Sequence, residues 1–414
     1  MEHFLFTNNS LSKRGYLYGI LQILLFQSKK NVAKTLELLK AYFSIPEDQI
    51  FLFSAGRMAV YSFIKSLNLS EEDEVVVAGY TCVVLTNAVK FTGCKIKYVD
   101  IEDEMFNIDI DKLRSELTST TKVFIVPHNF GIPFEGIQEI KKEFPQLIVI
   151  EDAAHAFGSR TKDGELCGKL GDASFFSLEY SKPITSGLGG IMLINNKALL
   201  PDFKKQYDTL EEMKGANVLR LICTLGVYNL LFFKRTNFFH VNGTRVLRKL
   251  NLIYRTSQKE IDGEIPDGYP TKLNSKLACF LPYQLKHIAK INNQKREIVQ
   301  LYNDSFSNFM DLNCVRNEGG ILVRFPLFFK NNVSLEKIEA IKKEGRLKGF
   351  NFGVWFNDVV HPQGSFRYGY IEGGCKVGEN VSKRIINLPV NVNFPLSKNQ
   401  LDDIIALFVK HGIK

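Results

Sequence analysis

The chain has 414 residues, which is too many for one ordinary hydrophobic core and predicts two domains. Hydrophobic residues make up 45% of it and charged residues 23%, as in soluble globular proteins, and no stretch has the uninterrupted apolar length of a membrane-spanning helix. The net charge of +9 suits an anionic partner such as a nucleotide, a phosphate, a nucleic acid or an acidic lipid, although a merely basic surface explains the total equally well.

The seven cysteines are scattered, and no two of them stand at Cys-x-x-Cys spacing. This pattern predicts neither a zinc site nor a disulfide framework, and it fits a reducing compartment. The first residues, MEHFLFTNNSLSKRG, lack the features of a signal peptide. We therefore expect a cytoplasmic protein without a metal site.

In chain order, residues 16–28 predict an apolar helix that is buried or lies in an interface, and residues 56–68 predict a helix that begins at a glycine. Short apolar runs then alternate with helical patterns. We expect strands at 75–78, 95–99, 123–127, 148–150, 173–178 and 190–194, and helices near 81–91, 110–117 and 137–144. This alternation is typical of an α/β fold in which helices cover both faces of a mostly parallel sheet.

Residues 203–265 interrupt this alternation. The segment 219–233 is strongly apolar, and the segment 234–259 that follows contains seven Lys or Arg and no acid. A helix packed against the sheet or a partner subunit is the favoured interpretation. The alternative is an amphipathic surface that touches a membrane or a lipid-linked substrate.

After residue 268 we expect a long helix at about 272–303, then a shorter αβ pattern that ends in a helix at 398–410. The chain therefore divides into a predicted large domain at 1–265, which includes the helical and basic insert at 203–265, and a smaller C-terminal α/β domain at 266–414.

Two acids, Glu151 and Asp152, stand at the end of the strand predicted at 148–150, and His155 follows them. A buried carboxylate is costly unless a cation meets it, and ligands gather at this end of the strands in a parallel sheet. Lys182 lies thirty residues after Asp152, in a loop that continues into the glycine-rich SGLGG. Pyridoxal phosphate would supply the missing cation, because its protonated pyridine nitrogen pairs with an aspartate while a lysine forms a Schiff base with it.

Two strand-to-helix turns support this interpretation. In FSAGRMAV, Gly56 opens a helix whose backbone N–H groups are suited to a phosphate, and Ser177 could add a hydroxyl. In AGYTCVV, either Tyr80 or Cys82 could lie against the cofactor ring. Each feature is weak by itself, but the ordered set predicts a pyridoxal phosphate site.

The set resembles the sugar aminotransferases of the DegT/DnrJ/EryC1/StrS type, which are fold-type-I pyridoxal phosphate enzymes. The similarity is dense from about 50 to 195, in segments such as VIEDAAHAFGS and GDASFFSLEYSKPITSGLGG, and it returns in CKVGENVSKRIINLPVNVNFPLSKNQLDDII. Residues 196–267 match poorly. The resemblance implies a large domain with a seven-stranded, mostly parallel sheet and a smaller α/β domain.

The resemblance also implies roles for single residues. Lys182 falls on the Schiff-base lysine and is the expected catalytic residue, and Asp152 falls on the partner of the pyridine nitrogen. The remaining positions expected to bind the cofactor are His155 near the ring, Ser177 and Gly56 with Arg57 at the phosphate, Cys82 against the ring, and Lys272 reaching the phosphate in a neighbouring subunit. Arg57, Cys82 and Lys272 depart from the residues that are usual in the family.

Three histidines and one arginine have open or alternative interpretations. His155 fits a structural residue in a tight turn equally well, and His128 either lines the substrate cleft or anchors a turn. His361 and Arg367 in the small domain are candidates to meet an anionic substrate.

The resemblance implies an aminotransferase that moves an amino group from an amino acid, glutamate in this family, to a nucleotide-linked keto sugar in polysaccharide or related sugar biosynthesis. It also implies a homodimer with shared active sites. A fold-type-I lyase acting on amino acids and a non-catalytic cofactor-binding or regulatory protein remain alternatives. No nucleic-acid-binding module is recognisable, and weak contact of residues 203–265 with a membrane surface is a further expectation.

Overall fold

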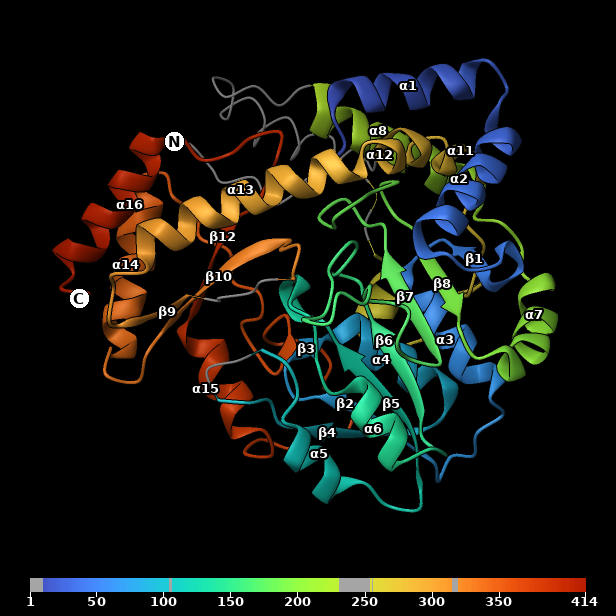
Figure 1. Ribbon diagram of the computed structural model, residues 1–414, viewed down its shortest axis with the longest axis horizontal. Coiled ribbons are helices and arrows are strands. Elements are labelled where there is room, and N and C mark those ends of the chain that lie inside the picture. The colour runs from blue at the N-terminus through green and yellow to red at the C-terminus, as the bar shows by residue number, and fades with distance from the viewer. Residues whose placement is uncertain (1–9, 104–105, 231–253, 255, 315–318) are drawn as a thin grey trace.

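The computed structural model describes the chain except for residues 1–9, 104–105, 231–253, 255 and 315–318. Its centre is a seven-stranded sheet with the order β1-β8-β7-β6-β5-β2-β4 (Figure 1). The strands are β1 (Ile50–Phe53), β2 (Glu74–Ala78), β4 (Lys95–Val99), β5 (Thr121–Pro127), β6 (Ile148–Asp152), β7 (Ala173–Ser177) and β8 (Gly190–Ile194). Strand β8 runs against the direction of the other strands of this sheet, which all point the same way. The predicted mostly parallel α/β sheet is confirmed.

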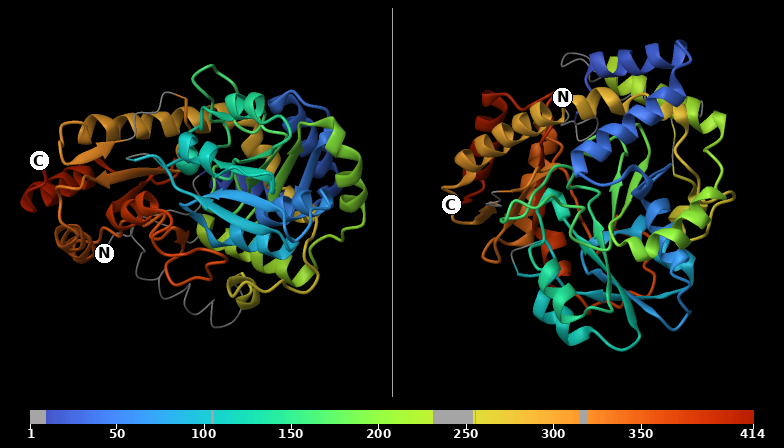
Figure 2. Two further views of the ribbon diagram at one scale, coloured as in Figure 1. Left: turned by 90° about the horizontal axis from the view of Figure 1, so that it is seen from below. Right: turned by 45° about the vertical axis from the view of Figure 1, so that its right-hand side comes forward.

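Helices cover both faces of this sheet (Figures 1 and 2). They are α2 (Ser28–Phe43), α3 (Gly56–Ser66), α4 (Val83–Thr92), α5 (Ile110–Glu116), α6 (Ile137–Glu143) and α7 (Leu200–Asp208), with the short turns η1 (Glu47–Gln49), η2 (Asn129–Gly131) and η3 (Lys197–Leu199). Alternate residues of one strand enter different cores: Val75 and Val77 of β2 pack in one cluster, and Val76 packs in the other. This two-sided burial explains why the strands appear in the sequence as unbroken apolar runs.

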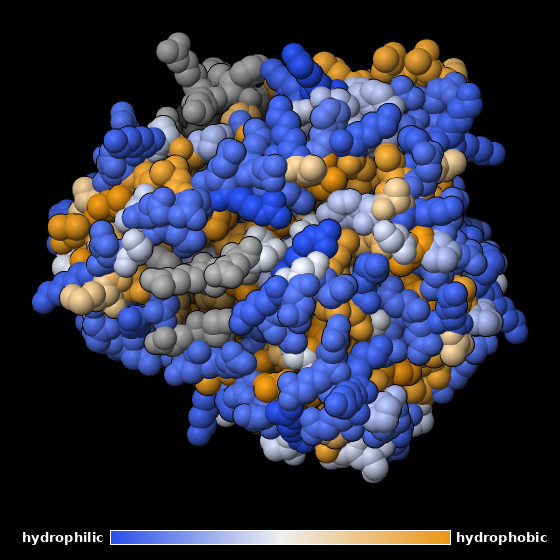
Figure 3. Space-filling view, viewed as in Figure 1, coloured by the Kyte–Doolittle hydropathy of each residue, from blue (hydrophilic) through white to orange (hydrophobic). Residues whose placement is uncertain are grey.

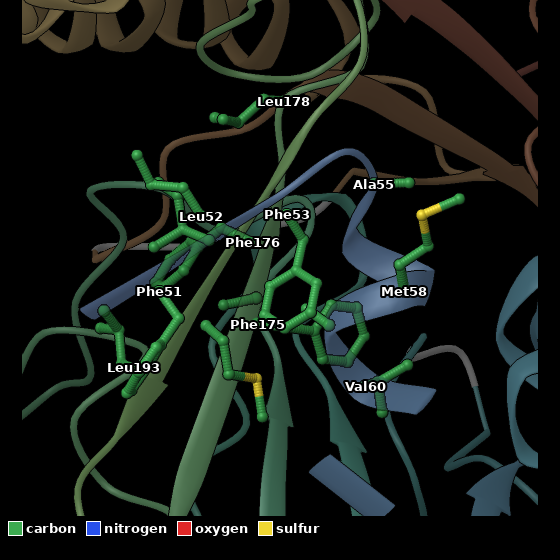
Figure 4. Packing of buried hydrophobic residues seen from close by; sticks show 14 of the residues in the cluster. Phe51, Leu52, Phe53, Ala55, Met58, Val60, Phe175, Phe176, Leu178 and Leu193 are labelled. Carbon is green, nitrogen blue, oxygen red and sulfur yellow. The ribbon is translucent and has the colours of Figure 1, made fainter. Parts of the chain in front are cut away.

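The larger core lies between the sheet and α3. Phe53 of β1 points toward α3 together with residues of β7 (Figure 4). The segment FSAGRMAV predicts a strand-to-helix turn, but the bounds of strand β1 were not predicted, since its four apolar residues carry no period that distinguishes a strand from a helix. The cluster places the start of α3 beside the end of β7, which is where two predicted site residues lie.

The prediction of one continuous helix at about 272–303 is wrong. The chain forms α11 (Ser275–Ala278), α12 (Leu281–Lys286) and α13 (Ile288–Phe306) in its place. Pro282 lies in the first turn of α12, and it has no N–H to continue a helix from α11. The helix predicted from residue 81 begins at Val83, because Thr81 and Cys82 form strand β3.

A second, smaller sheet lies beside the first and has the order β12-β10-β9, with all pairs antiparallel. Its strands are β9 (Leu312–Cys314), β10 (Arg324–Phe329) and β12 (Ile385–Pro389), and the nearby helices are α14 (Leu335–Leu347), α15 (Lys376–Arg384) and α16 (Lys398–Lys410). A separate core fills it, with Tyr302, Phe325 and Phe408 among its buried side chains. The domain boundary near residue 266 stays a prediction.

Strand β11 (Val360–His361) pairs with β3 (Thr81–Cys82) and so joins the C-terminal part of the chain to the start of α4. In this parallel pair His361 stands opposite Cys82. The contact brings a loop of the small region to the C-terminal edge of the large sheet.

Helices α1 (Lys13–Leu24) and α8 (Gly215–Leu230) pack on each other and on the start of the α11–α12 segment. Tyr16 of α1 stacks on Phe280 with ring centroids 5.6 Å apart, and Gly19 allows this close approach, because a Cβ there would come within 2.3 Å of the Phe280 ring. The short helix α10 (Gln258–Ile261) follows the segment that the structure does not describe. No helix among the described residues is long and apolar enough to cross a membrane.

Lys295 on α13 is fully buried, and its Nζ has no hydrogen-bond partner among the described residues. Burial lowers the pKa of this amine from 10.5 to about 7. Between these two values the unfolded chain binds a proton that the folded chain does not, so this group makes the free energy of unfolding rise with pH. We expect Lys295→Met to raise that free energy by up to about 4 kcal/mol near pH 6, and by less near pH 9.5.

Urea unfolding at these two pH values measures the effect. Lys290→Met, which changes an exposed lysine on the same helix, is the matched control and should shift stability by less than about 0.5 kcal/mol. A Lys295→Met protein that gains nothing over this control near pH 6 would contradict the assignment.

Candidate active site

Strand β6 directs its two terminal acids to opposite sides of the sheet. Glu151 is fully buried, and its carboxylate accepts hydrogen bonds from the backbone N–H groups of Gly168, Leu170 and Gly171 at 2.6–2.7 Å. It also contacts Nε2 of His128 at 3.0 Å. Glu151 is therefore a structural acid that fastens the loop after β6.

His128 anchors a turn. Its Nδ1 accepts a hydrogen bond from the backbone N–H of Phe134 at 3.0 Å, so the ring proton lies on Nε2 and is donated to Glu151. Both ring nitrogens are thus used inside the fold. Of the two interpretations of His128, the structure supports the anchor and not a cleft residue.

Asp152 accepts one hydrogen bond, from the backbone N–H of Ala154 at 3.1 Å. Burial raises the pKa of its carboxyl group, against the opposing effects of that hydrogen bond and of the nearby Lys182 and His128. A cation brought against Asp152 would therefore be stabilised and would lower this pKa. Asp152 and Lys182 are thirty residues apart in sequence, and the charge of each acts on the pKa of the other.

Lys182 and His155 are in direct contact, with Nζ and Nε2 2.8 Å apart. His155 Nδ1 accepts the backbone N–H of Phe130 at 3.2 Å, which leaves the single proton of a neutral imidazole on Nε2. That proton can be donated only to a lone pair, so Lys182 is an uncharged amine in this arrangement. Burial lowers the pKa of Lys182 and lowers that of His155 well below its ordinary value, in agreement with two neutral partners.

Two residues of the site were not predicted. The indole of Trp355 stacks on His155 with ring centroids 4.9 Å apart and planes at 10°, and Lys182 Nζ lies 4.4 Å from the indole centroid. Arg324, the first residue of β10, places its guanidinium carbon 3.2 Å from the same centroid. Trp355 is the one tryptophan of the chain, which is the signal that could have drawn attention to it.

Gly56 and Ser177 lie side by side where α3 begins. A Cβ on Gly56 would stand 3.2 Å from the carbonyl oxygen of Phe176 and 3.5 Å from the Cα of Ser177, so the glycine allows the helix start to approach β7. The Ser177 hydroxyl accepts from the backbone N–H of Glu179 at 3.4 Å. The first N–H groups of a helix have no intrahelical partner, so this turn can hold a phosphate.

Arg57 is the second residue of α3, and its guanidinium pairs with the carboxylate of Glu260, with Nη2 and Oε2 3.0 Å apart. Both side chains are almost fully buried. Of the two possibilities for Arg57, a contact to a phosphate or a side chain directed elsewhere, this pair favours the second. A contact from its remaining N–H groups to a phosphate stays a prediction.

Cys82 directly precedes α4 and stands opposite His361 in the pairing of β3 with β11. Burial raises the pKa of its thiol, while Lys182 lowers it and Asp152 raises it further. Tyr80 does not share this position. It is fully buried, and its hydroxyl accepts the N–H of Phe356 at 2.7 Å and donates to the carbonyl of the same residue at 3.2 Å. Tyr80 therefore holds the loop that carries Trp355 and is not available to lie against a cofactor.

His361 and Arg367 have separate positions. His361 Nδ1 bonds to Oδ1 of Asn357 at 2.7 Å, and burial together with Arg324 and Lys182 lowers the pKa of His361 to about 4. His361 thus belongs to the cluster as a neutral ring. Arg367 pairs with Asp358, and no contact between Arg367 and Lys182 is found among the described residues.

Lys272 lies beside β1, where its Nζ donates to the carbonyl oxygen of Asp208 at 3.2 Å and sits 4.8 Å from the Tyr207 ring centroid. Within its own chain it is not brought to Lys182. The expected contact with the phosphate of a neighbouring subunit stays a prediction.

The buried groups fit pyridoxal phosphate. The neutral Lys182 amine can attack an aldehyde, the Asp152 carboxyl can meet a pyridinium, and the turn at Gly56 can accept a phosphate. No group of three or more potential metal-ligating side chains is found among the described residues.

A sequence model of the DegT/DnrJ/EryC1/StrS aminotransferase family matches residues 39–409. The chain belongs to this family. GDP-perosamine synthase from Escherichia coli O157:H7 is 37% identical over 164 residues, which are 39% of this chain and 43% of that one. The site of Lys182 and Asp152 therefore lies in a chain of aminotransferase ancestry.

Two solved structures are similar along nearly the whole chain. Helicobacter pylori PseC, an aminotransferase involved in the biosynthesis of pseudoaminic acid, superposes with a TM-score of 0.74 at 17% identity and covers 99% of this chain and 98% of its own. NtdA from Bacillus subtilis with bound cofactor PMP gives a TM-score of 0.71 at 19% identity, covering 96% of this chain and 82% of that one. At these identities the likeness shows the fold.

Proposed function

We propose that this member of the family is a pyridoxal-phosphate-dependent sugar aminotransferase that takes an amino group from an amino acid, glutamate by family resemblance. The acceptor is a nucleotide-linked keto sugar in polysaccharide or related sugar biosynthesis. The observation that carries the proposal is the part-buried contact of Lys182 Nζ with His155 Nε2 at 2.8 Å, with Asp152 acting on the same amine.

The cofactor, when bound, supplies an electron-accepting ring that stabilises a carbanion next to nitrogen. The residues of the chain hold it and move protons. Lys182 would hold the cofactor through its Nζ and would move the proton of the substrate carbon as a base. Asp152 holds the ring nitrogen protonated, His155 orients the lysine, and Gly56 with Ser177 receives the phosphate.

The alternatives differ in what they require of this cluster. A non-catalytic regulatory protein needs no amine of lowered pKa, yet burial lowers the pKa of Lys182, and its Nζ lies 2.8 Å from His155 Nε2. A lyase acting on amino acids would need no keto-sugar acceptor. The name GDP-perosamine synthase belongs to a relative that acts on a nucleotide sugar, and it favours the sugar branch.

Two half-reactions test the proposal. The purified protein with pyridoxal phosphate should show a visible absorption band that L-glutamate converts to the near-ultraviolet band of pyridoxamine phosphate. A panel of UDP-, GDP- and dTDP-linked keto sugars should restore the visible band with one of them. Conversion by glutamate without restoration by any keto sugar, together with release of an elimination product, would point to the lyase.

A cytoplasmic homodimer with shared active sites stays a prediction. Measuring the mass of the protein in solution tests whether it is a dimer.

Contact of residues 203–265 with a membrane surface also stays a prediction, since 231–253 and 255 lie outside the described residues. In the described part, Leu219 of α8 is 62% exposed, and apolar side chains gather over α1 along the upper edge of Figure 3. Sedimentation with vesicles that contain anionic lipid tests the contact, and equal recovery with and without such vesicles would exclude it.

A further inference from the structure

The segment that carries Lys182 lies between β7 and β8 and folds back on itself. The backbone N–H of Lys182 donates to the carbonyl oxygen of Glu179 at 2.9 Å. The hydroxyl of Thr185, a fully buried residue, donates to the carbonyl oxygen of Leu178 at 2.9 Å and accepts from the backbone N–H of Gly187 at 2.9 Å. Because all of these bonds run within the segment, its place relative to the surrounding helices depends on other contacts.

Gln284 of α12 supplies such a contact from outside the segment. Its Oε1 accepts from the backbone N–H of Thr185 at 3.0 Å, and its Nε2 donates to the carbonyl oxygen of the same residue at 2.7 Å. The second proton of Nε2 is donated to the carbonyl oxygen of Phe280 at 2.7 Å. Gln284 is fully buried, so water does not compete for these bonds. The side chain pairs with both backbone groups of Thr185, as a residue of a neighbouring strand would.

The chain between Thr185 and Lys182 is short and constrained. It consists of Pro183, whose ring restricts its φ to about −65°, and Ile184, which is buried. The carbonyl oxygen of Pro183 also accepts from the hydroxyl of Ser10, which is itself buried and comes before α1. A fixed Thr185 therefore leaves little freedom to the backbone of Lys182.

We propose that Gln284 is a positioning residue for Lys182, which holds the backbone after the lysine so that its amine stands where the reaction needs it. This inference rests on the proposed function, since it concerns the base of that reaction. Gln284 acts through Thr185 and not on the amine itself. The Lys182 amine lies 2.8 Å from Nε2 of His155, and a misplacement of a reacting group by about 1 Å can slow a reaction by about 100-fold.

A role in stability alone is the other interpretation of Gln284, because a buried amide that satisfies backbone groups stabilises a fold wherever it lies. Gln49 provides the comparison. It is 4% exposed, and its Nε2 donates to the carbonyl oxygen of Ile194 at 2.5 Å, at the end of β8 that is farther along the chain from Lys182. Loss of either glutamine leaves a buried backbone group unpaired, but only the bonds of Gln284 end on the segment of Lys182.

Half-reactions of the loaded protein with L-glutamate separate the two roles. Gln284→Met keeps the length of the side chain and removes the pair with Thr185, and Gln284→Glu keeps the shape but, when ionised, donates no hydrogen bond. Gln49→Met is the matched control. The visible band gives the cofactor bound to each protein. Stopped-flow absorbance gives the maximal rate of conversion and the L-glutamate concentration at half that rate, and urea unfolding gives the midpoint.

Gln284→Met should lower the maximal rate by about 30- to 300-fold, and Gln284→Glu by at least about 10-fold, because the amine is no longer held in place. The L-glutamate concentration at half the maximal rate and the visible absorbance per protein should change less than about 3-fold. Gln49→Met should lower the urea midpoint as the Gln284 variants do, but its maximal rate should stay within about 2-fold of the wild type.

Gln284 variants that fold, load and convert L-glutamate as fast as Gln49→Met would overturn the assignment. If Gln284→Met does not fold, the maximal rate of Gln284→Glu decides. Failure of both variants to fold would also overturn it, because Gln284 would then be needed for the fold as a whole. A wild type that forms no visible band, or whose band L-glutamate does not convert, would count against the proposed function instead.

Discussion

A Lys182→Ala protein is expected to lose its visible band with pyridoxal phosphate, and its rate of amino transfer should fall by at least about 10³-fold. The alanine removes both the amine that bonds the cofactor and the base that moves the proton. Lys182 Nζ lies 2.8 Å from Nε2 of His155, and no second lysine amine is found in contact with the His155 ring among the described residues. Absorption spectra and stopped-flow half-reactions with L-glutamate measure both losses.

Lys197→Ala is the control for this prediction. Lys197 is an exposed lysine in η3, and its replacement should leave spectrum and rate within about 2-fold of the wild type. If Lys182→Ala still converted L-glutamate at the normal rate, the role of Lys182 would have to be abandoned.

Glu260→Gln is expected to lower the free energy of unfolding by about 3–5 kcal/mol, because it leaves the buried Arg57 cation without its partner. Burial acts to lower the pKa of Arg57, but Glu260 outweighs it and raises that pKa. The backbone carbonyl oxygen of Glu260 also ties α10 to α4, since it accepts from Nδ2 of Asn87 at 2.6 Å. Urea unfolding without added cofactor measures the loss.

Two comparisons isolate the cause. Glu37→Gln breaks an exposed pair with Lys34 on α2 and should cost less than about 1 kcal/mol. The double replacement Arg57→Met with Glu260→Met removes both charges and should recover most of the stability lost in Glu260→Gln. Equal losses in the single and the double variant would show that the ion pair is not the cause.

The parts of the fold that could be predicted from the sequence are those in which local pattern and burial agree. The strands of the parallel sheet are apolar on both faces, so their runs are visible, and their carboxyl ends meet, so Asp152 and Lys182 could be brought together across thirty residues. The helix 398–410 was predicted with the bounds that it has, because Ser397 caps it and its buried side chains recur with helical period.

The rest depends on contacts between distant segments. The partners of Glu151 are backbone N–H groups, which no side-chain pattern reveals. Tyr80 was offered as an alternative to Cys82 at the ring, because its true partner, Phe356, is 276 residues away. Arg324 belongs to the second sheet, and Trp355 belongs to the segment between α14 and β11. Only the packing of the two regions of the chain places these residues near Lys182.

The most direct test of the central claim is to reduce the loaded protein with borohydride, digest it and locate the pyridoxyl group by mass spectrometry. The account predicts one modified residue, Lys182, at stoichiometric yield, and a much lower yield when Asp152 is replaced by alanine. Label on another lysine, or no stable label in a protein that still transfers amino groups, would contradict it.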